Sequence, residues 1–246
     1  MSKYSIELVP RDFQQLENDI KTIDSFPHFE FINIPDLKRF NIRSWESAQL
    51  VKKYNYTFIP HFRAIDFNVE KPEKIFKIIE ENELEKVLII SGDPPQDMSY
   101  EVFPTSSISL CKIIKKDFPK IKIYGALDPY RSSIKDEMDY LDKKKDCGFD
   151  GFFSQPFFDL RLLEIFLENY EDDEIYWGIS PVTSIRSKNY WETRNRASFP
   201  KEFTPSFEWN VNFAKKAIEY LDKKKHQLYF MPIKIDMEKY LKCIFY

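Results

Sequence analysis

Lys86-Val87-Leu88-Ile89-Ile90-Ser91-Gly92-Asp93-Pro94-Pro95 is the stretch of this sequence that decides its fold. Its first five residues form an unbroken run of high strand propensity, which is typical of a strand buried on both faces of a sheet. The strand must end at Gly92 and the prolines, because glycine permits unusual backbone angles and proline cannot donate to a sheet. Asp93 is therefore predicted at the carboxyl end of a buried strand, where α/β enzymes carry their chemistry.

Short apolar runs of this kind alternate with longer amphipathic stretches along the whole chain. The other expected strands are 5–9, 29–34, part of 56–66, 122–127, 151–157, 174–179 and 227–234. Eight strand–helix units at roughly thirty-residue spacing suit a chain near the ~250 residues typical of (β/α)8 barrels. We predict an α/β protein with a single domain over residues 1–246, a (β/α)8 TIM barrel. A doubly wound open sheet is the alternative, but it usually has fewer units at this length.

The helices are predicted from capping residues followed by apolar side chains at three-to-four spacing. The expected helices are 12–26, 45–54, 73–83, 106–117, 133–147, 160–170, 209–224 and 236–245. Ser44 and Thr105 are expected to cap the second and fourth of these. Pro60 and His61 are expected to make part of 56–66 irregular, and 182–207 is expected to be a long polar and aromatic connection.

Composition excludes several classes of protein. Acidic and basic residues are interspersed at a net charge of −3, so nothing predicts binding to nucleic acid or to an anionic membrane. No apolar run approaches the ~20 residues of a membrane span, and residues 1–7 lack a signal-peptide core. Cys111, Cys147 and Cys243 are widely spaced and read as reduced thiols without metal-ligand spacing. We therefore expect a cytoplasmic globular protein without a metal site.

In a barrel, the residues that follow the strands meet at one mouth. They are Glu7, Pro35, Asp36, His61, Asp93, Leu127, Asp128, Ser154, Gln155, Ser180 and Lys234. Glu7 lies in an apolar strand, where burial would raise its pKa and suit it to proton donation. Gln155 lies among aromatic residues, and its amide suits hydrogen bonding to a planar heterocycle.

Each candidate also has a purely structural alternative. Glu7 could face outward from its strand, and Gln155 could be a satisfied core amide. His61 could be a buried imidazole bonded to backbone, and Asp93 could cap its own turn. Competing constellations are absent from the sequence, which contains no nucleophile elbow, zinc-protease motif, P-loop or glycine-rich dinucleotide turn.

Six segments, in order along essentially the whole chain, resemble the methylenetetrahydrofolate reductase family. They are Ser5-Ile6-Glu7, Pro60-His61-Phe62-Arg63-Ala64-Ile65-Asp66, Ser91-Gly92-Asp93-Pro94-Pro95, Lys143-Lys144-Lys145-Asp146-Cys147-Gly148-Phe149, Ser154-Gln155-Pro156-Phe157-Phe158-Asp159 and Gly178-Ile179-Ser180-Pro181-Val182. The Gly-Asp-Pro-Pro and Gln-x-Phe-Phe-Asp segments are the most specific. The fold of this family is an eight-fold barrel, in agreement with the strand count.

The resemblance implies a flavoprotein of one-carbon metabolism. It would move a hydride between NADH or NADPH, bound FAD and 5,10-methylenetetrahydrofolate, in either direction. Glu7 would be the acid that protonates the folate, so that its five-membered ring opens to an iminium ion. Asp93 would lie beside flavin and pterin, where its negative charge stabilises that cation.

The same resemblance implies roles for five further side chains. Gln155 would contact the pterin and the nicotinamide in turn. Lys234 would lie near the folate, and Trp191 would stack on bound ligand. His61 and Lys144 would lie on the flavin side, with Lys144 near the phosphates.

Three segments depart from the family pattern, all on the flavin side. A Thr-Tyr-Gly segment with a glycine-rich turn is replaced by 35–40, the arginine before Gly-Asp-Pro by Ser91, and a Tyr-Pro-Glu-x-His-Pro segment by 127–132. Three functions therefore stay open. The chain could be a flavin-dependent oxidoreductase, a folate-binding or regulatory protein that has lost FAD and redox activity, or a flavin-independent NAD(P)H–folate reductase. A folate is the expected small-molecule partner, and a second copy or another protein could also bind.

Overall fold

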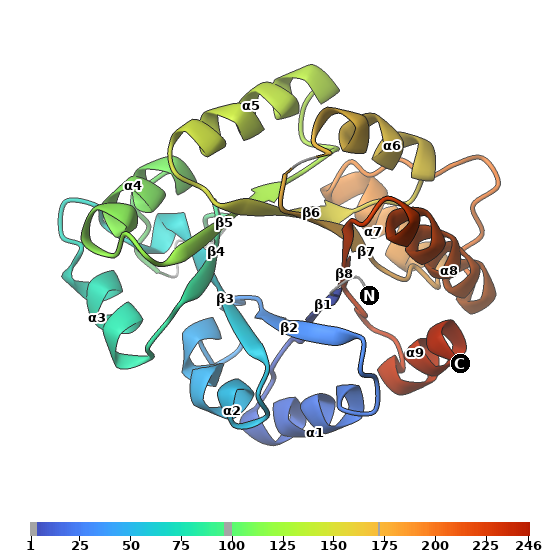
Figure 1. The fold of residues 1–246 in the computed structure, drawn as a ribbon, viewed down its shortest axis with the longest axis horizontal. Coiled ribbons are helices and arrows are strands. Elements are labelled where there is room, and N and C mark those ends of the chain that lie inside the picture. The colour runs from blue at the N-terminus through green and yellow to red at the C-terminus, as the bar shows by residue number, and fades with distance from the viewer. Residues whose placement is uncertain (1–3, 96–99, 172) are drawn as a thin grey trace.

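The computed structural model describes residues 4–95, 100–171 and 173–246. Of residues 1–7, which were considered above for a signal-peptide core, the first three therefore lie outside the described part. Eight parallel strands close into a barrel in chain order, with the helices around it (Figure 1). The strands are β1 (Tyr4–Glu7), β2 (Phe29–Ile34), β3 (Thr57–Arg63), β4 (Lys86–Ile90), β5 (Lys122–Leu127), β6 (Gly151–Pro156), β7 (Ile175–Ile179) and β8 (Gln227–Phe230). The predicted TIM barrel is confirmed, and β4 has the predicted bounds.

The helices pack their apolar faces on the outside of the barrel. They are α1 (Phe13–Ile23), α2 (Ala48–Lys53), α3 (Glu73–Glu81), α4 (Ser107–Asp117), α5 (Ile134–Asp146), α6 (Leu160–Asn169), α7 (Ile185–Arg194), α8 (Phe207–Lys223) and α9 (Met237–Phe245). In α3, for example, the buried side chains are Ile75, Ile78 and Ile79, which share one helical face. Asp12 caps α1, at the start of the expected helix 12–26, by accepting a hydrogen bond from the Gln15 backbone at 2.7 Å.

Two predictions of local structure are wrong. β3 continues through Pro60 and His61 to Arg63, and Pro60 is paired with Ile34 of β2. Burial of both strand faces outweighs the one ladder hydrogen bond that proline cannot make. The connection 182–207 contains α7, which begins after the capping residue Ser184.

Two predicted caps are also wrong, because the two hydroxyls bind backbone carbonyls of β3 and of the segment that follows it. Ser106, not Thr105, caps α4. Thr105 donates to the Phe67 carbonyl at 2.6 Å. Ser44 begins a 3-10 turn (Ser44–Ser47) and donates to the His61 carbonyl at 2.6 Å. These carbonyls are buried and need a donor, so tertiary contacts outrank local capping.

An aromatic cluster fills the interior of the barrel. Its buried members are Phe31, Ile59, Leu88, Tyr124, Phe153, Tyr176, Tyr229 and Met231. Tyr124 and Tyr176 direct their hydroxyls to Glu174, which immediately precedes β7, whereas the Tyr229 hydroxyl reaches Glu7 at the carboxyl end of β1. The interior of the barrel below the carboxyl-end mouth is therefore a packed core and not a pore.

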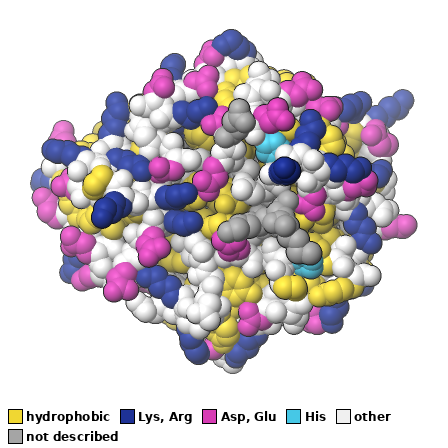
Figure 2. Space-filling view, in the orientation of Figure 1, with side chains coloured by type: hydrophobic (Ala, Val, Ile, Leu, Met, Phe, Trp, Pro, Cys, Tyr) yellow, Lys and Arg dark blue, Asp and Glu magenta, His cyan; other side chains and the backbone are white. Residues whose placement is uncertain are grey.

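Charges of both signs are mixed over the face of the molecule shown in Figure 2, with no large field of one sign. Among residues 4–95, 100–171 and 173–246, no helix has the length and apolar character needed to cross a membrane.

Candidate active site at the barrel mouth

Glu7 ends β1 and faces the barrel interior. Alternation along β1 directs Ile6 to the helices and Ser5 and Glu7 inward. The Glu7 carboxylate accepts a hydrogen bond from the Tyr229 hydroxyl of β8. Burial raises the pKa of Glu7 to about 7, although the hydrogen bond from Tyr229 acts in the opposite direction. A carboxyl group with this pKa can give and take a proton near neutral pH.

His61 lies on β3 below the mouth, in a buried polar chain. Its Nε2 lies 3.2 Å from Oδ1 of Asn33, and the Asn33 amide nitrogen donates to the Ser5 hydroxyl. Because Oδ1 is an acceptor, Nε2 carries the hydrogen. Burial lowers the pKa of His61 to about 3, so the ring is neutral near pH 7. Asn33 is the register partner of Glu7, which places this chain next to the acid.

Asp93 follows β4, and its side chain is exposed. Its position depends on Gly92, whose φ of +82° lies in the left-handed region. A Cβ at Gly92 would lie 3.0 Å from Cβ and Nε of Arg63. Arg63 donates through Nη2 to the Asp93 carbonyl, and to the Tyr100 hydroxyl at 2.9 Å. The backbone of Asp93 is thus held while its carboxylate stays exposed.

Arg63 is the site residue that the sequence reasoning missed. It is only 7% exposed and ends β3, which was expected to break at Pro60. The inward alternation of Ile59, His61 and Arg63 was the signal that could have found it. Its guanidinium lies against Gly92, next to Ser91, the position where the family pattern has an arginine. A neighbouring strand therefore supplies a cation to this part of the mouth.

An ion network extends from Arg63 to the loop after β2. One oxygen of the buried Asp66 lies 3.0 Å from Lys38, 3.1 Å from Arg43 and 3.8 Å from Arg63. Its other oxygen is buried without a hydrogen-bond partner among the described residues. Asp36 pairs with Arg43, and burial raises the pKa of Asp36 against the effect of that arginine. Each cation of this network is paired inside the protein.

Lys144 of α5 is 2% exposed. Its ammonium donates to the Ala126 carbonyl of β5 and lies 4.3 Å from the centroid of the Tyr140 ring. Burial lowers the pKa of Lys144 to about 8, although the charge of Glu137 opposes that shift. In this arrangement Lys144 joins α5 to the barrel.

The three predicted folate contacts lie in different surroundings. Gln155 is partly exposed, and it lies where the register of β6 against β7 shifts between Phe153 and Pro156, so alternation along the strand does not fix the direction of its side chain. Lys234 is exposed and lies beyond the end of β8, with a φ of 55°. Trp191 is only 8% exposed, and its ring packs edge-on against that of Phe158, with ring centroids 5.4 Å apart. The structure thus places Trp191 in an apolar cluster, and its stacking on a ligand stays a prediction.

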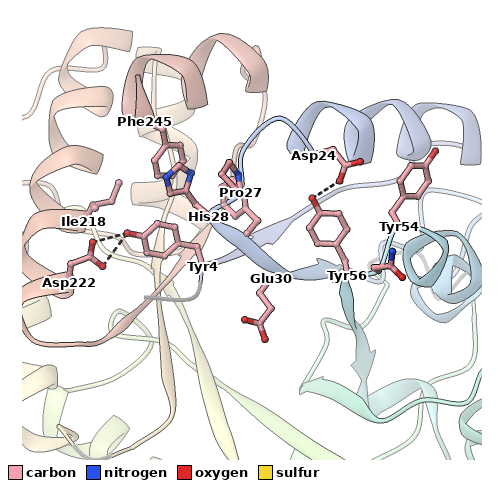
Figure 3. A pocket seen from close by; sticks show the side chains of 12 residues that line it. Tyr4, Asp24, Pro27, His28, Glu30, Tyr54, Tyr56, Ile218, Asp222 and Phe245 are labelled. Atoms are coloured by element: carbon pink, nitrogen blue, oxygen red, sulfur yellow. Dashed lines mark hydrogen bonds between the residues drawn. The ribbon is translucent and has the colours of Figure 1, made fainter. Parts of the chain in front are cut away.

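A cavity of about 600 Å³ lies around the start of β1, at the opposite end of the barrel (Figure 3). Tyr4 donates to Asp222 at 3.0 Å, and Tyr56 donates to Asp24 at 2.8 Å. The His28 ring stacks on Phe245 with centroids 4.2 Å apart. These contacts join α1, α8 and α9 to the strands, as expected of the end of a TIM barrel that serves stability.

Residues 3–221 match the model of the methylenetetrahydrofolate reductase family. The chain belongs to that family. The 5,10-methylenetetrahydrofolate reductase of Buchnera aphidicola subsp. Schizaphis graminum (strain Sg) is 24% identical over 155 residues, which are 61% of this chain and 53% of that protein. The same enzyme of Pectobacterium carotovorum subsp. carotovorum is 25% identical over 154 residues, which are 61% and 52% of the two chains. This family member thus spans about half the length of the curated relatives it matches.

Solved structures agree with the barrel fold of the methylenetetrahydrofolate reductase family. An uncharacterized protein from Clostridium thermocellum that binds two copies of 5-methyl-5,6,7,8-tetrahydrofolic acid has a TM-score of 0.69 at 13% identity, covering 98% of this chain and 93% of that one. An oxaloacetate acetylhydrolase has a TM-score of 0.58 at 7% identity, covering 95% and 75%. At such identities the likeness shows the fold alone.

The flavin-side positions of this methylenetetrahydrofolate reductase family member do not fit FAD as they stand. Lys144, which the resemblance puts near the flavin phosphates, is buried on the Ala126 carbonyl. Arg63 donates a hydrogen bond to the Asp93 carbonyl. Asp36 lies in the segment that replaces the glycine-rich turn, and it forms an ion pair with Arg43. These groups satisfy one another instead of facing a ligand.

Proposed function

We propose that this chain binds a reduced folate at the barrel mouth and interconverts 5,10-methylenetetrahydrofolate and 5-methyltetrahydrofolate, with Glu7 as the acid. The observation that carries the proposal is the partly buried Glu7 carboxyl at the end of β1, which accepts a hydrogen bond from Tyr229 and whose pKa is raised to about 7. Membership of the methylenetetrahydrofolate reductase family over residues 3–221 supports the substrate class. A protein of the same fold that binds 5-methyltetrahydrofolate also supports it.

In this proposal, Glu7 transfers its proton to the methylene-bridged folate. One carbon–nitrogen bond of the five-membered ring breaks, its electron pair goes to the protonated nitrogen, and an iminium cation remains. A hydride added to the iminium carbon then forms the methyl group. The exposed Asp93 carboxylate would stabilise the cation. The amide of Gln155 would orient the pterin, and Lys234 would attract the carboxylates of the folate.

A reduced nicotinamide is the proposed ultimate source of the hydride, and the family-level expectation is that it passes through FAD. His61 could approach a bound ring only as a neutral imidazole, because burial lowers its pKa to about 3. Lys144 would have to leave the Ala126 carbonyl to reach a phosphate. No step of the proposal is therefore assigned to the flavin. When bound, FAD would supply hydride transfer between nicotinamide and folate.

A second candidate function is folate binding without redox chemistry. The paired state of Lys144, Arg63 and Asp36 favours it, because the flavin side of the mouth is filled by contacts within the protein. A third is direct hydride transfer from NAD(P)H to the folate. Consumption of NADH or NADPH by flavin-free protein, dependent on methylenetetrahydrofolate, would distinguish the third from the second.

The central experiment replaces Glu7 by Gln, which keeps the shape of the side chain and removes the acid. Folate turnover should fall at least a hundredfold, within the range typical of general acid catalysis. Any oxidation of NADH or NADPH that does not depend on folate should persist. The matched control is Glu174→Gln, because Glu174 also accepts hydrogen bonds from interior tyrosines but precedes β7 rather than ending a strand. Loss of the folate-independent oxidation together with folate turnover in Glu7→Gln would assign Glu7 a structural role instead.

A further inference from the structure

Tyr229 and the partly buried Glu7 form a hydrogen-bonded pair between β8 and β1, where the barrel closes. Tyr229 lies on β8 and is 3% exposed, and β8 pairs with β1 through Ser5 and Ile6. Its ring packs edge-on against Phe153, with ring centroids 5.0 Å apart. The hydroxyl donates to Oε2 of Glu7, and no other bond of this hydroxyl is recorded in the described part of the chain.

We propose that Tyr229 is a positioning residue for the acid: by donating to Oε2 of Glu7, it directs the transferable proton to Oε1. This inference rests on the proposed acid role of Glu7. An oxygen that accepts the phenol hydrogen is a poor site for a second proton, so the neutral carboxyl carries its hydrogen on the other oxygen. The same bond stabilises the carboxylate that remains after proton transfer, because a hydrogen bond to an ionised acceptor is strengthened.

Tyr229 suits this role because it remains a donor. Burial, followed by the nearby charge and the hydrogen bond of Glu7, raises the pKa of Tyr229 well above its ordinary value. The other titratable groups near this end act differently. His61 is neutral and bonded to Asn33, Arg63 is bonded to the Asp93 carbonyl, and Lys234 is exposed. In the described residues, Tyr229 is the one side chain recorded as a hydrogen-bond partner of Glu7.

Tyr229→Phe removes the donor and keeps the ring. Glu7 should then lose its proton at higher pH, because the bond from Tyr229 favours the ionised form. The alkaline limb of folate turnover should move up by about one pH unit, and kcat should fall by about tenfold. The matched control is Tyr124→Phe, which removes a 2.7 Å hydrogen bond to Glu174 in the same aromatic cluster. Its alkaline limb should coincide with that of the unmodified chain.

A second measurement is independent of turnover. The side-chain carboxyl of Glu7 is followed by carbon-13 NMR as a function of pH, and its signal is identified by its loss in Glu7→Gln. The midpoint should lie near pH 7 and rise in Tyr229→Phe. Incorporation of 3-fluorotyrosine at position 229, which strengthens the donor without removing the hydroxyl, should lower the midpoint and serves if the phenylalanine variant does not fold.

The two levels of the hypothesis then fail separately. If no folate turns over but the midpoint moves as expected, the proposed function is wrong and the Tyr229–Glu7 coupling stands. If the midpoint of Glu7 is the same in the unmodified, phenylalanine and fluorotyrosine forms, the role of Tyr229 is overturned. An equal change in Tyr124→Phe would also overturn it, because the effect would then come from general loosening of the barrel interior.

Discussion

Arg63, at the end of β3, donates to the backbone carbonyl of Asp93, which follows the neighbouring strand β4. The same nitrogen donates to the Tyr100 hydroxyl at 2.9 Å. Arg63 therefore connects the two sides of the loop that carries Asp93. Two backbone contacts reinforce this connection, since Ile65 donates to the Ser91 carbonyl at 3.2 Å and Phe103 donates to the Ile65 carbonyl at 2.8 Å.

If Arg63 acts by positioning Asp93, its loss should matter only while Asp93 is present. We expect Arg63→Met to lower kcat/KM for the folate by about tenfold, which is the size of one lost charge-assisted hydrogen bond. In an Asp93→Asn background the same substitution should have little further effect. The measurement is a double-mutant cycle, with urea unfolding to verify that each variant is folded. Simple additivity would mean that Arg63 does not act through Asp93.

Gly92 should tolerate substitution poorly, for two separable reasons. Its φ of +82° is strained for alanine, and the new Cβ would lie 3.0 Å from Arg63 and from Ile65. We expect Gly92→Ala to lower the free energy of unfolding by ~2–3 kcal/mol. Gly148→Ala is the control, because Gly148 has a φ of +100° but, among the described residues, its Cβ would meet only Lys115, at 3.7 Å. That variant should lose ~1 kcal/mol, the cost of the left-handed backbone alone.

Glu7 should also make stability depend on pH. Its folded pKa of about 7 exceeds its ordinary value of 4.5, so the folded state holds a proton that the unfolded state releases between these values. The contribution of protonated Glu7 to the free energy of unfolding is complete below about pH 4.5 and is lost as pH rises through 7. We therefore expect Glu7→Gln to gain ~1–3 kcal/mol relative to the unmodified chain between pH 5 and pH 9. Urea unfolding at pH 5, 7 and 9 measures it, and Glu174→Gln should not show this gain.

Folate binding should not require flavin. Because Lys144 and Arg63 are engaged within the protein, we expect the purified chain to lack the absorption of bound FAD and to take up little added FAD. Calorimetric titration of this flavin-free protein with 5-methyltetrahydrofolate should show saturable binding, weakened by Lys234→Ala. A yellow protein that is bleached by NADH would contradict the expectation and establish the flavin-dependent reaction. Absence of folate binding both in the flavin-free protein and in the protein with added FAD would contradict the proposed function.

The resemblance to the family predicted the folate side of the mouth from single residues, because Glu7, Asp93 and Gln155 each lie close to the carboxyl end of a strand that periodicity identifies. Trp191 and Lys144 show the limit of that reasoning. A tryptophan in a polar connection looks available to a ligand, yet α7 folds over the barrel and buries it against Phe158. A lysine run at a helix end looks solvated, yet Lys144 turns inward to the Ala126 carbonyl.

By itself, the sequence determined the barrel and the placing of its strands, because alternation and buried apolar runs are local signals repeated along the chain. Only the tertiary structure decided which side chains work as pairs. Tyr229 reaches Glu7 across 222 positions because closing β8 on β1 brings the ends of the chain together. Arg63 reaches Asp93 because β3 and β4 share a register. Such partners depend on closure and register, which no local pattern of residues records.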